Sequence, residues 1–461
     1  MTVKQGTEVM PQGDENIPIK AKRAMVLQEQ TRIARFKGSV IIEMNGKWHE
    51  MSSDLFAEAC YRQFGFGVNK SVIADLEHLF RTTAQDLSDR AHLIDFGGAV
   101  WNMKKLDWDQ DIDPKECVYR VDWQPVGDAA PIPFIMDLAK NDKGVYDDIM
   151  QSCAPIIMDK KPTGVIWYLG GGANGKSTLV HLLYKIFGPY LTEITVKQLE
   201  DERDTPQLNG KLANICKESS EGFVEDTRTY KSIGTHENFS VHKFHSQDMV
   251  EIEGNVHHIF SANNIPTFGD KSYGARRRTL VIPFQNQFTP NELFEEKTFT
   301  NKFIERFIAE LIKYAQQLKD QKYEYDFSNT TNLMKEKYDT DANTAQTYAD
   351  ELVEQDIVGF ENYNSLRMDY ENWCLDHGYK PSSINILRRS MDEKGFERKS
   401  ARDENNRVSK MYAKMGSDTT NMVRVTGRLG LFQSKGSNHE LDVLDTEQKQ
   451  QMLGNWTGGK K

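Results

Sequence analysis

A glycine-rich segment between two apolar runs constrains the fold of this chain more than any other feature. Residues 170–177 read GGGANGKS and fit the pattern G-x-x-x-x-G-K-[ST] without a mismatch, directly after VIWYL and directly before TLVHLLYKIF. In a strand–loop–helix unit of this kind, glycines let backbone N–H groups converge on phosphate oxygens, and the helix N-terminus adds a favourable dipole. The segment predicts a phosphate-binding loop; the alternative is a structural glycine-rich turn.

The side chains of this loop have specific expected roles. Lys176 is expected to neutralise the charge of β- and γ-phosphates, and Ser177 is expected to bind Mg²⁺. The residues predicted to contact the nucleotide are Gly170, Gly172, Asn174, Gly175, Lys176, Ser177 and Thr178. Because kinases, GTPases, loaders and motors all use such loops, the downstream residues must separate these classes.

Strand-like apolar segments alternate with helical and polar segments around the loop. GVIWYLG, KLANICKE, VHHIFSAN and TLVIPF lie between residues 164 and 284, and an amphipathic helix is expected over residues 301–319. Alternation of this kind predicts an α/β fold built on a largely parallel sheet.

Acidic and amide side chains follow two of these strands. Glu218 comes after the strand LANIC, where a carboxylate can hold Mg²⁺ or polarise an attacking water. Glu221 follows in the same loop, so the division of labour between the two acids is open, and a solvated loop acid is the alternative. Asn263 ends the strand VHHIFSAN and is expected to orient the lytic water in the same carboxyl-end crevice.

Three consecutive arginines, Arg276, Arg277 and Arg278, precede the strand TLVIPF. An arginine here is expected to reach the γ-phosphate held by a neighbouring subunit, which would make hydrolysis depend on assembly. A basic patch for DNA phosphates, or plain surface charge, is the alternative.

The loop, the acid-ended strand, SANNIP and RRRTLVIPF stand in an order and rough spacing that resemble superfamily 3 helicases of the phage, plasmid and poxvirus type. The resemblance extends over roughly residues 45–415 and implies an AAA+-like P-loop ATPase core. The roles that it implies are nucleotide and Mg²⁺ binding for Lys176 and Ser177, the main catalytic acid for Glu218, the sensor for Asn263, and a trans-acting arginine for Arg277 or Arg278.

Members of that family grip single-stranded nucleic acid with a hairpin between the acidic strand and the sensor strand. Here that interval holds FSVHKFHSQDMVEIEG, in which Lys243 and His245 are the candidates for contacts to phosphate. Ordinary strand residues are the alternative.

A chain of 461 residues is long enough for several domains. Helical spacing over residues 55–87 and short strands over residues 92–126 predict a small α+β domain, and helices followed by a strand pair predict a winged-helix-like domain near the C-terminus. The expected divisions are a flexible tail at 1–30, the N-terminal domain at 31–129, the helicase ATPase domain at 130–322, the C-terminal helical and winged-helix domain at 323–420, and a weakly structured tail at 421–461. Because the N-terminal domain occupies most of the segment before the loop, we expect no primase polymerase domain there.

Composition limits the partners. The net charge is −10, so contacts with nucleic acid must come from local basic patches. No apolar run approaches the ~20 residues that span a bilayer, and no secretory signal is visible. We therefore expect no membrane contact and a cytoplasmic location, in the host cell if the chain is phage-encoded.

The resemblance implies a DNA helicase that forms a hexameric ring and uses ATP and Mg²⁺ in phage- or plasmid-type replication. Such a protein moves 3′ to 5′ on single-stranded or forked DNA and works beside replication partners such as a primase or a polymerase. The alternative is an ATP-controlled, DNA-binding initiator or loader that remodels DNA without processive unwinding. A small-molecule P-loop kinase suits the loop but not the arginines, the hairpin interval or the winged helix.

Overall fold

Continuous apolar runs determine the centre of the structure. In the computed structural model, β9 (Val165–Leu169) and β15 (His257–Ala262) are buried along almost their whole length. Such burial is expected of central strands in a parallel sheet that is covered on both faces. They belong to a five-stranded parallel sheet in the order β10-β11-β15-β9-β17. Its other strands are β10 (Leu191–Thr192), β11 (Ala213–Cys216) and β17 (Thr279–Pro283).

The fold is therefore mixed α/β with a parallel sheet, as the alternation of segments predicted. The structure describes residues 23, 24, 26, 27 and 31–434, apart from 45, 65–67, 128–130, 202, 219–222, 225–226, 243–248, 264–266, 269–272, 343, 378, 380, 403–407, 416–421 and 425–430. The chain divides into two compact units, Met1–Lys335 and Glu336–Lys461. The finer domain divisions stay predictions.

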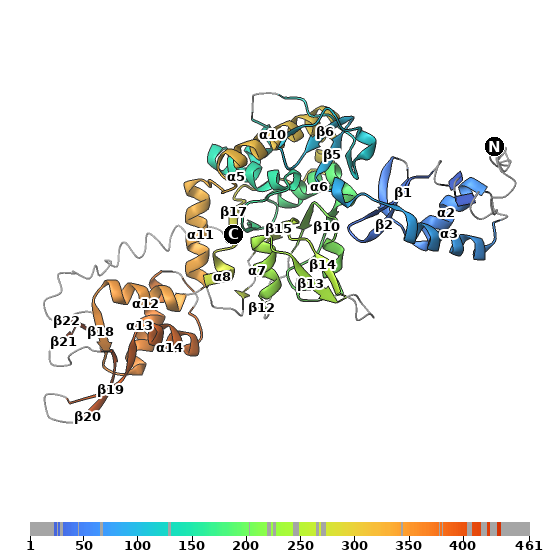
Figure 1. Ribbon diagram of the computed structural model, residues 1–461. Helices are drawn as coiled ribbons and strands as arrows, with labels where there is room; N and C mark the ends of the chain where they lie inside the picture. The colour runs from blue at the N-terminus through green and yellow to red at the C-terminus, as the bar shows by residue number, and fades with distance from the viewer. Residues whose placement is uncertain are drawn as a thin grey trace. The chain divides into compact units, whose positions relative to one another are not determined.

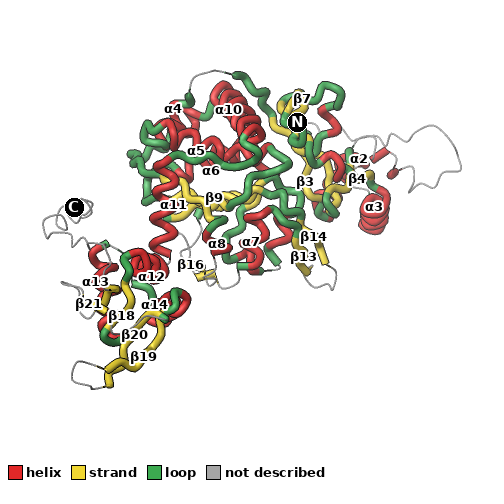
Figure 2. The backbone as a smooth tube through the Cα atoms, turned by 60° about the vertical axis from the view of Figure 1, so that its left-hand side comes forward, coloured by secondary structure: helices red, strands yellow, loops and turns green. Residues whose placement is uncertain are grey.

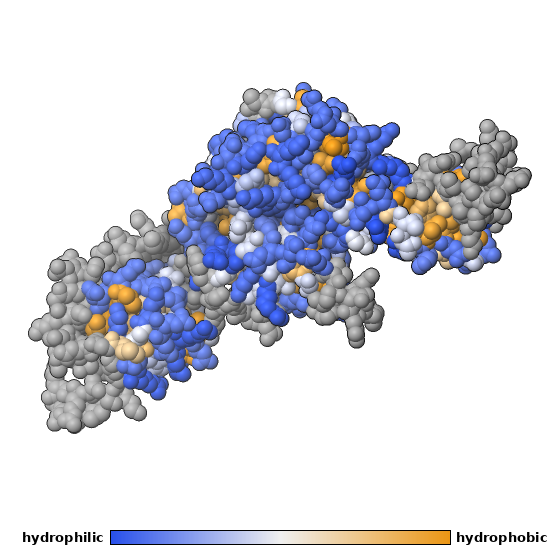
Figure 3. Space-filling view, viewed as in Figure 1, coloured by the Kyte–Doolittle hydropathy of each residue, from blue (hydrophilic) through white to orange (hydrophobic). Residues whose placement is uncertain are grey.

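Helices cover both faces of the central sheet (Figures 1 and 2). Side chains that alternate along β9 separate two apolar cores, because Ile166 and Tyr168 pack into one and Val165 and Trp167 into the other. The helices of the first core are α4 (Pro133–Leu138), α5 (Lys143–Cys153), α6 (Lys176–Phe187) and α10 (Asn301–Asp320), and those of the second are α7 (Arg228–Thr235) and α8 (Tyr273–Arg276). The visible surface of this unit is mostly hydrophilic (Figure 3).

The helix α10 confirms the amphipathic pattern over residues 301–319 and ends one residue later. Its apolar face is buried in the first core through Phe307, Leu311 and Ala315. Two further helices of the chain are α9 (Phe294–Thr298) and α11 (Asn329–Ala342), the second of which contains the boundary between the units. None of the helices in the described stretches combines the length and the apolar character that a membrane crossing requires.

A buried hydrogen-bond network fixes α7 against the second face. Trp167 Nε1 donates to Tyr230 Oη at 3.0 Å, and Tyr230 Oη lies 2.8 Å from Thr279 Oγ1. Because these polar groups are buried, each needs a partner, and together they tie α7 to β9 and β17.

Two small sheets precede the central sheet in the chain, with the orders β3-β2-β1-β4 and β7-β6-β5-β8. Their strands are β1 (Ile33–Phe36), β2 (Ser39–Met44), β3 (Lys47–Glu50), β4 (Gln85–Asp86), β5 (Leu93–Phe96), β6 (Ala99–Asn102), β7 (Asp107–Trp108) and β8 (Tyr119–Val121). Helices α2 (Ser53–Phe64) and α3 (Lys70–Thr83) pack against the first sheet. The predicted helices and the strands after residue 92 are confirmed, whereas β1, β2 and β3 were not foreseen.

Polar contacts join the small sheets to each other and to the central part of the first unit. Arg120 Nη1 donates to Glu43 Oε1 at 2.8 Å, and both side chains are largely buried. Tyr119 Oη donates to the carbonyl oxygen of Gly210 at 3.1 Å. These contacts link β8 both to β2 and to the loop before β11.

Two pairs of short strands complete the first unit. The pairs are parallel β12 (Phe223–Val224) with β16 (Thr267–Phe268) and antiparallel β13 (Phe239–His242) with β14 (Met249–Ile252). The second pair lies in the interval where the hairpin was predicted.

The second unit has an apolar core of its own, centred on Tyr348, Phe360, Trp373, Leu387 and Met391. Helices surround an antiparallel sheet in the order β19-β20-β18-β22-β21. Its elements are α12 (Thr344–Glu354), β18 (Ile357–Phe360), α13 (Tyr363–Asp376), α14 (Ile384–Glu393), β19 (Phe396–Arg402), β20 (Val408–Lys414), β21 (Met422–Arg424) and β22 (Leu431–Ser434). Helices followed by a strand pair are confirmed, and the winged-helix assignment stays a prediction.

Asn214 interrupts the apolar run of β11, and its contacts explain why. The side chain is fully buried; its Oδ1 accepts from Ile194 N at 2.7 Å, and its Nδ2 donates to Ile194 O at 2.9 Å. The amide thus satisfies both backbone polar groups of one residue beside the sheet edge.

We expect Asn214→Ala to lower the free energy of unfolding by about 2–4 kcal/mol, because two buried backbone groups lose their partners. Chemical denaturation followed by tryptophan fluorescence measures this change. Asn332→Ala is the control, since the side chain of Asn332 is exposed and donates to Phe327 O. Equal stability losses for the two variants would contradict the explanation.

Candidate phosphate-binding site

The loop between β9 and α6 has the backbone that its glycines predict. Gly175 caps α6 with φ +82°, a left-handed conformation that favours glycine. A Cβ added to Gly175 would lie 2.3 Å from Leu138 Cδ2, and one added to Gly170 would lie 2.3 Å from the carbonyl oxygen of Phe284. Gly171 and Gly172 have no such neighbour within 4 Å, so their side of the loop is open.

Lys176 begins α6 and folds back over the loop. Its Nζ donates to Gly170 O at 2.6 Å, to Gly171 O at 3.1 Å and to Asn174 Oδ1 at 3.1 Å. The residue is only 7% exposed. Burial lowers the pKa of Lys176, while the carboxylate of Glu218 acts in the opposite direction. An ammonium held by neutral carbonyl oxygens can exchange them for phosphate oxygens, which offer a stronger, charge-assisted hydrogen bond.

The side chain of Asn174 connects the loop to the segment that follows β17. Its Nδ2 donates to Gly171 O at 2.6 Å and to Phe284 O at 3.3 Å, so the side chain connects the loop to the end of β17. The backbone N–H of Phe288 donates to Ala173 O at 2.7 Å. The segment that follows β17 therefore holds the loop from one side.

A cavity of about 390 Å³ lies over this loop. It is lined by Gly171, Gly172, Ala173, Asn174, Gly175, Lys176, Ser177, Thr178, Lys217, Glu218, Ser261, Ala262 and Asn263. The predicted loop residues other than Gly170, the predicted acid and the predicted sensor thus meet in one place, although about 90 residues separate the loop from Asn263 in the sequence. The volume falls in the range of small-molecule sites.

Parallel pairing brings these groups together. Glu218 follows β11 and Asn263 follows β15, and both strands end at the same edge of the sheet as β9. From β9 the chain continues to β10 on one side of that strand, and it later reaches β17 on the other side. In a parallel sheet, such a reversal of strand order leaves a crevice at the carboxyl end of the strand. The side chains of Glu218 and Asn263 are both exposed to that crevice.

Two residues with polar side chains that the sequence prediction missed also line the cavity. Lys217 directly precedes Glu218, and its Nζ lies 5.2 Å from the centre of the Tyr184 ring. Ser261 is fully buried, and its Oγ has no hydrogen-bond partner among the residues that the structure describes. Lys217 follows β11, and Ser261 lies near the end of β15. Because the sequence predicted that these two strand ends meet, their position could have identified both residues.

The arginines lie at the opposite end of the sheet. Thr279 at the start of β17 pairs with Val165 at the start of β9, whereas the loop follows the other end of β9. At ~3.3 Å per residue, the five residues of β9 place about 16 Å between these ends. Arg277 and Arg278 do not line the cavity of their own chain.

The three arginines differ in their contacts. Arg278 Nη1 donates to Gly274 O at 2.7 Å, and Arg276 O accepts from Lys335 Nζ at 2.8 Å. Burial and the neighbouring Arg277 guanidinium lower the pKa of Arg278. Of the three, Arg277 has the most exposed side chain.

Three predicted residues cannot be placed. Lys243 and His245, the candidates for contact to nucleic acid, lie outside the described residues, as does Glu221. The strands β13 and β14 on either side of residues 243–248 are described and pair from Phe239 with Ile252 to His242 with Met249. The division of labour between Glu218 and Glu221 therefore stays open.

The residues present fit a magnesium ion bound together with phosphates. Ser177 and Glu218 offer the oxygen ligands that Mg²⁺ prefers, and protein sites commonly supply only one or two of its ligands when phosphates supply others. Within the described residues, no group of three or more His, Cys, Asp and Glu side chains is arranged to hold a metal ion without such help.

Comparisons with known proteins give the following similarities. A family described as "Family of unknown function (DUF5906)" matches residues 168–278, which run from the end of β9 to the arginines. A search of curated proteins finds no match. The chain is similar to "The A form apo structure of NrS-1 C terminal region-CTR", with 15% identity, a TM-score of 0.48, and coverage of 85% of this chain and 98% of that one. It is also similar to "The apo structure of NrS-1 C terminal region (305-718)", with 13% identity, a TM-score of 0.44, and coverage of 85% and 97%.

Two glycines of the loop provide a matched test of its geometry. We expect Gly170→Ala to destabilise the protein by about 1–3 kcal/mol, because the new Cβ would meet a backbone carbonyl at 2.3 Å. Gly171→Ala should change stability by less than about 0.5 kcal/mol, since its Cβ meets open space. Thermal unfolding compares the stabilities of the two variants. Equal stability losses would contradict the close approach of Gly170 to Phe284 O.

Proposed function

We propose that this chain is an ATP-dependent DNA translocase of the helicase type that acts as a ring of identical subunits. The observation that carries the proposal is the cavity in which the phosphate-binding loop, Glu218 and Asn263 meet at one edge of a parallel sheet. That combination suits hydrolysis of a nucleoside triphosphate, because phosphate, metal ion and water can each find a polar partner there. The core is then a P-loop ATPase of the AAA+ type, as the sequence resemblance implies.

In this proposal the loop binds the triphosphate. Backbone N–H groups between Gly170 and Gly175 face the phosphates, and Lys176 leaves the loop carbonyls to contact the β- and γ-phosphates. Ser177 and Glu218 would hold Mg²⁺, which would supply neutralisation of the phosphate charge. Asn263 orients the attacking water, and Glu218, or Glu221, accepts its proton.

An arginine from the adjoining subunit completes the site. Arg277 and Arg278 lie about 16 Å of strand away from their own loop, so neither can serve the phosphates that its own chain holds. Arg277 is the better candidate, because its side chain is exposed while Arg278 is held by Gly274 O. Stabilisation of transition-state charge by an arginine supplied in trans accelerates phosphoryl transfer by about 10³–10⁵.

The remaining assignments extend this proposal to DNA. The hairpin β13–β14 carries Lys243 and His245, which we propose contact the backbone of a single strand in the ring. By resemblance, the direction is 3′ to 5′, the ring is a hexamer, and the setting is phage- or plasmid-type replication in the cytoplasm, beside a primase or a polymerase. The second unit supplies the winged-helix-like domain.

A strand-displacement assay on forked DNA separates this function from its alternative. Sustained, ATP-dependent unwinding supports a helicase. ATP-dependent binding to DNA without displacement would instead identify an initiator or loader with the same ATPase site.

Mixing two inactive variants tests the shared site. Lys176→Ala should lose nucleotide binding and hydrolysis, whereas Arg277→Ala should bind nucleotide normally but hydrolyse it at least 10²-fold more slowly. A mixture should recover activity, because an Arg277→Ala subunit keeps an intact loop and receives the arginine of a Lys176→Ala neighbour.

Arg62→Ala is the control for loss of an exposed arginine, since Arg62 forms an ion pair with Glu58 in its own helix. It should hydrolyse ATP at the unaltered rate. Loss of nucleotide binding in Arg277→Ala, or no recovery on mixing, would refute the trans role.

A further inference from the structure

Glu193 directly follows β10 and lies at the same edge of the central sheet as the predicted acid. β10 pairs with β11 in parallel, with Thr192 beside Asn214, so Glu193 stands next to the strand that Glu218 follows. The side chain of Glu193 is exposed. Glu193 is not among the described residues that line the cavity over the phosphate-binding loop. An effect of Glu193 on the reaction would therefore pass through a neighbouring residue.

The carboxylate of Glu193 holds the backbone directly before Glu218. The N–H of Lys217 donates to Glu193 Oε1 at 3.2 Å. In the described pairing of β11 with β15, the last pair is Cys216 with Phe260, so Lys217 and Glu218 lie beyond the end of that pairing. Another contact of this segment is the thiol of Cys216, which donates to Glu218 O at 3.4 Å, and a thiol is a weak donor. The position of Glu218 therefore depends on side-chain contacts such as that of Glu193.

The backbone of Glu193 is itself held on both sides. Before it, Thr192 O accepts from Tyr184 Oη of α6 at 3.0 Å, and the same hydroxyl donates to a carbonyl oxygen of β11 at 3.0 Å. After it, the buried amide of Asn214 binds the N–H and the C=O of Ile194 at 2.7 and 2.9 Å. Because both flanking residues are fixed, the carboxylate of Glu193 extends from a defined position. The asparagine that interrupts β11 thus contributes to the edge of the sheet as well as to stability.

The side chain of Lys217 is held by the same tyrosine. Its Nζ lies 5.2 Å from the centre of the Tyr184 ring, and Tyr184 belongs to α6, the helix that begins at the phosphate-binding loop. The segment that carries Glu218 is thus tied to this helix through one contact and to Glu193 through another. A single exposed contact of this kind contributes little to global stability, so its removal should shift the segment without unfolding the protein.

We infer that Glu193 is a positioning residue for hydrolysis, because its carboxylate holds the N–H of Lys217 and thereby aims the carboxylate of Glu218 at the cavity. The inference rests on the proposed function, in which Glu218 acts on the triphosphate or on the attacking water. Reaction rates are sensitive to such placement, since a shift of about 1 Å in a reacting group can cost about 10²-fold. In this role Glu193 is needed as a hydrogen-bond acceptor and not for its charge.

Two substitutions separate the acceptor from the charge. Glu193→Ala should lower kcat for ATP about tenfold and leave KM for ATP within about twofold, because the phosphate-binding loop is untouched. Glu193→Gln should retain most of the activity, because its amide oxygen can accept the same hydrogen bond. Glu296→Ala is the matched control, since it removes an exposed carboxylate of α9, and it should hydrolyse ATP at the unaltered rate.

Amide hydrogen exchange of the free protein checks the contact without ATP. Peptides that contain residue 217, followed by mass spectrometry, should show exchange of the Lys217 N–H about tenfold faster in Glu193→Ala than in the unaltered chain. Exchange in Glu193→Gln should match that of the unaltered chain.

Full activity of Glu193→Ala would overturn the inference, and so would unchanged exchange at residue 217. A loss of activity in Glu193→Gln as large as that in Glu193→Ala would also overturn it, because the charge of Glu193 would then act directly. Failure of the proposed function is distinct, because it would appear as absence of ATP hydrolysis in the unaltered chain.

Discussion

Parallel pairing of β9 with β15, and of β15 with β11, is the constraint on which the rest of the structure depends. Parallel strands end at one edge, so every residue that follows such a strand is delivered to the same crevice. Glu218 and Asn263 lie beside the loop because the strands that precede them run parallel to β9. An antiparallel neighbour would have carried one of them to the far side of the sheet.

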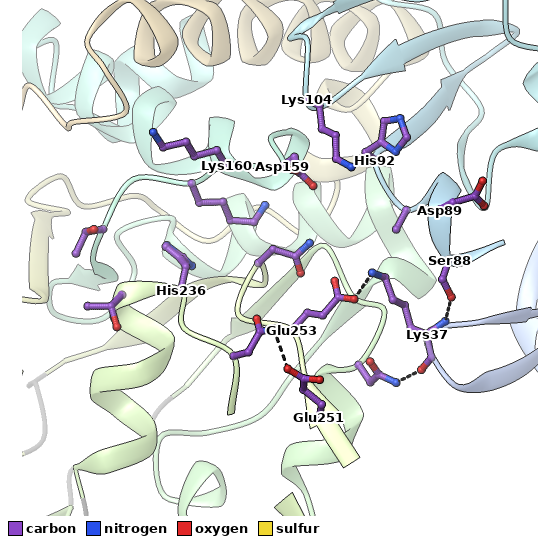
Figure 4. Close-up of a pocket in the computed structure, with 17 residues that line it drawn as sticks. Lys37, Ser88, Asp89, His92, Lys104, Asp159, Lys160, His236, Glu251 and Glu253 are labelled. Atoms are coloured by element: carbon purple, nitrogen blue, oxygen red, sulfur yellow. Dashed lines mark hydrogen bonds and ion pairs between the residues drawn. The ribbon is translucent and has the colours of Figure 1, made fainter. Parts of the chain in front are cut away.

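The two ends of the sheet have different chemistry as a result. At the carboxyl ends, glycines and a buried lysine make a loop that is open beside Gly171 and Gly172. At the amino ends lie the arginines before β17 and a second cavity beside the base of the β13–β14 pair, lined by lysines and carboxylates alike (Figure 4). In the proposed ring, one end would hold the nucleotide of its own chain, while the other would meet the neighbour and the DNA.

Local sequence patterns predicted the loop, the parallel sheet and α10, because each depends on residues close together in the chain. Lys217 and Ser261 were missed because their relevance depends on which strands pair, and no local pattern contains that information. The strands β1, β2 and β3 were missed because charged residues such as Glu43, Lys47 and Glu50 obscure their alternation. Asn214 interrupts the apolar run of β11, and only its two contacts with Ile194, which are not visible in the sequence, explain its place there.

Completion of the ATPase site by a neighbouring copy is the central claim, and the rate of ATP hydrolysis per chain at different protein concentrations tests it most directly. The account predicts that this rate falls toward zero as dilution separates the subunits, in step with the assembled fraction measured by light scattering or mass photometry. A rate per chain that stays constant in fully dissociated protein would contradict the account.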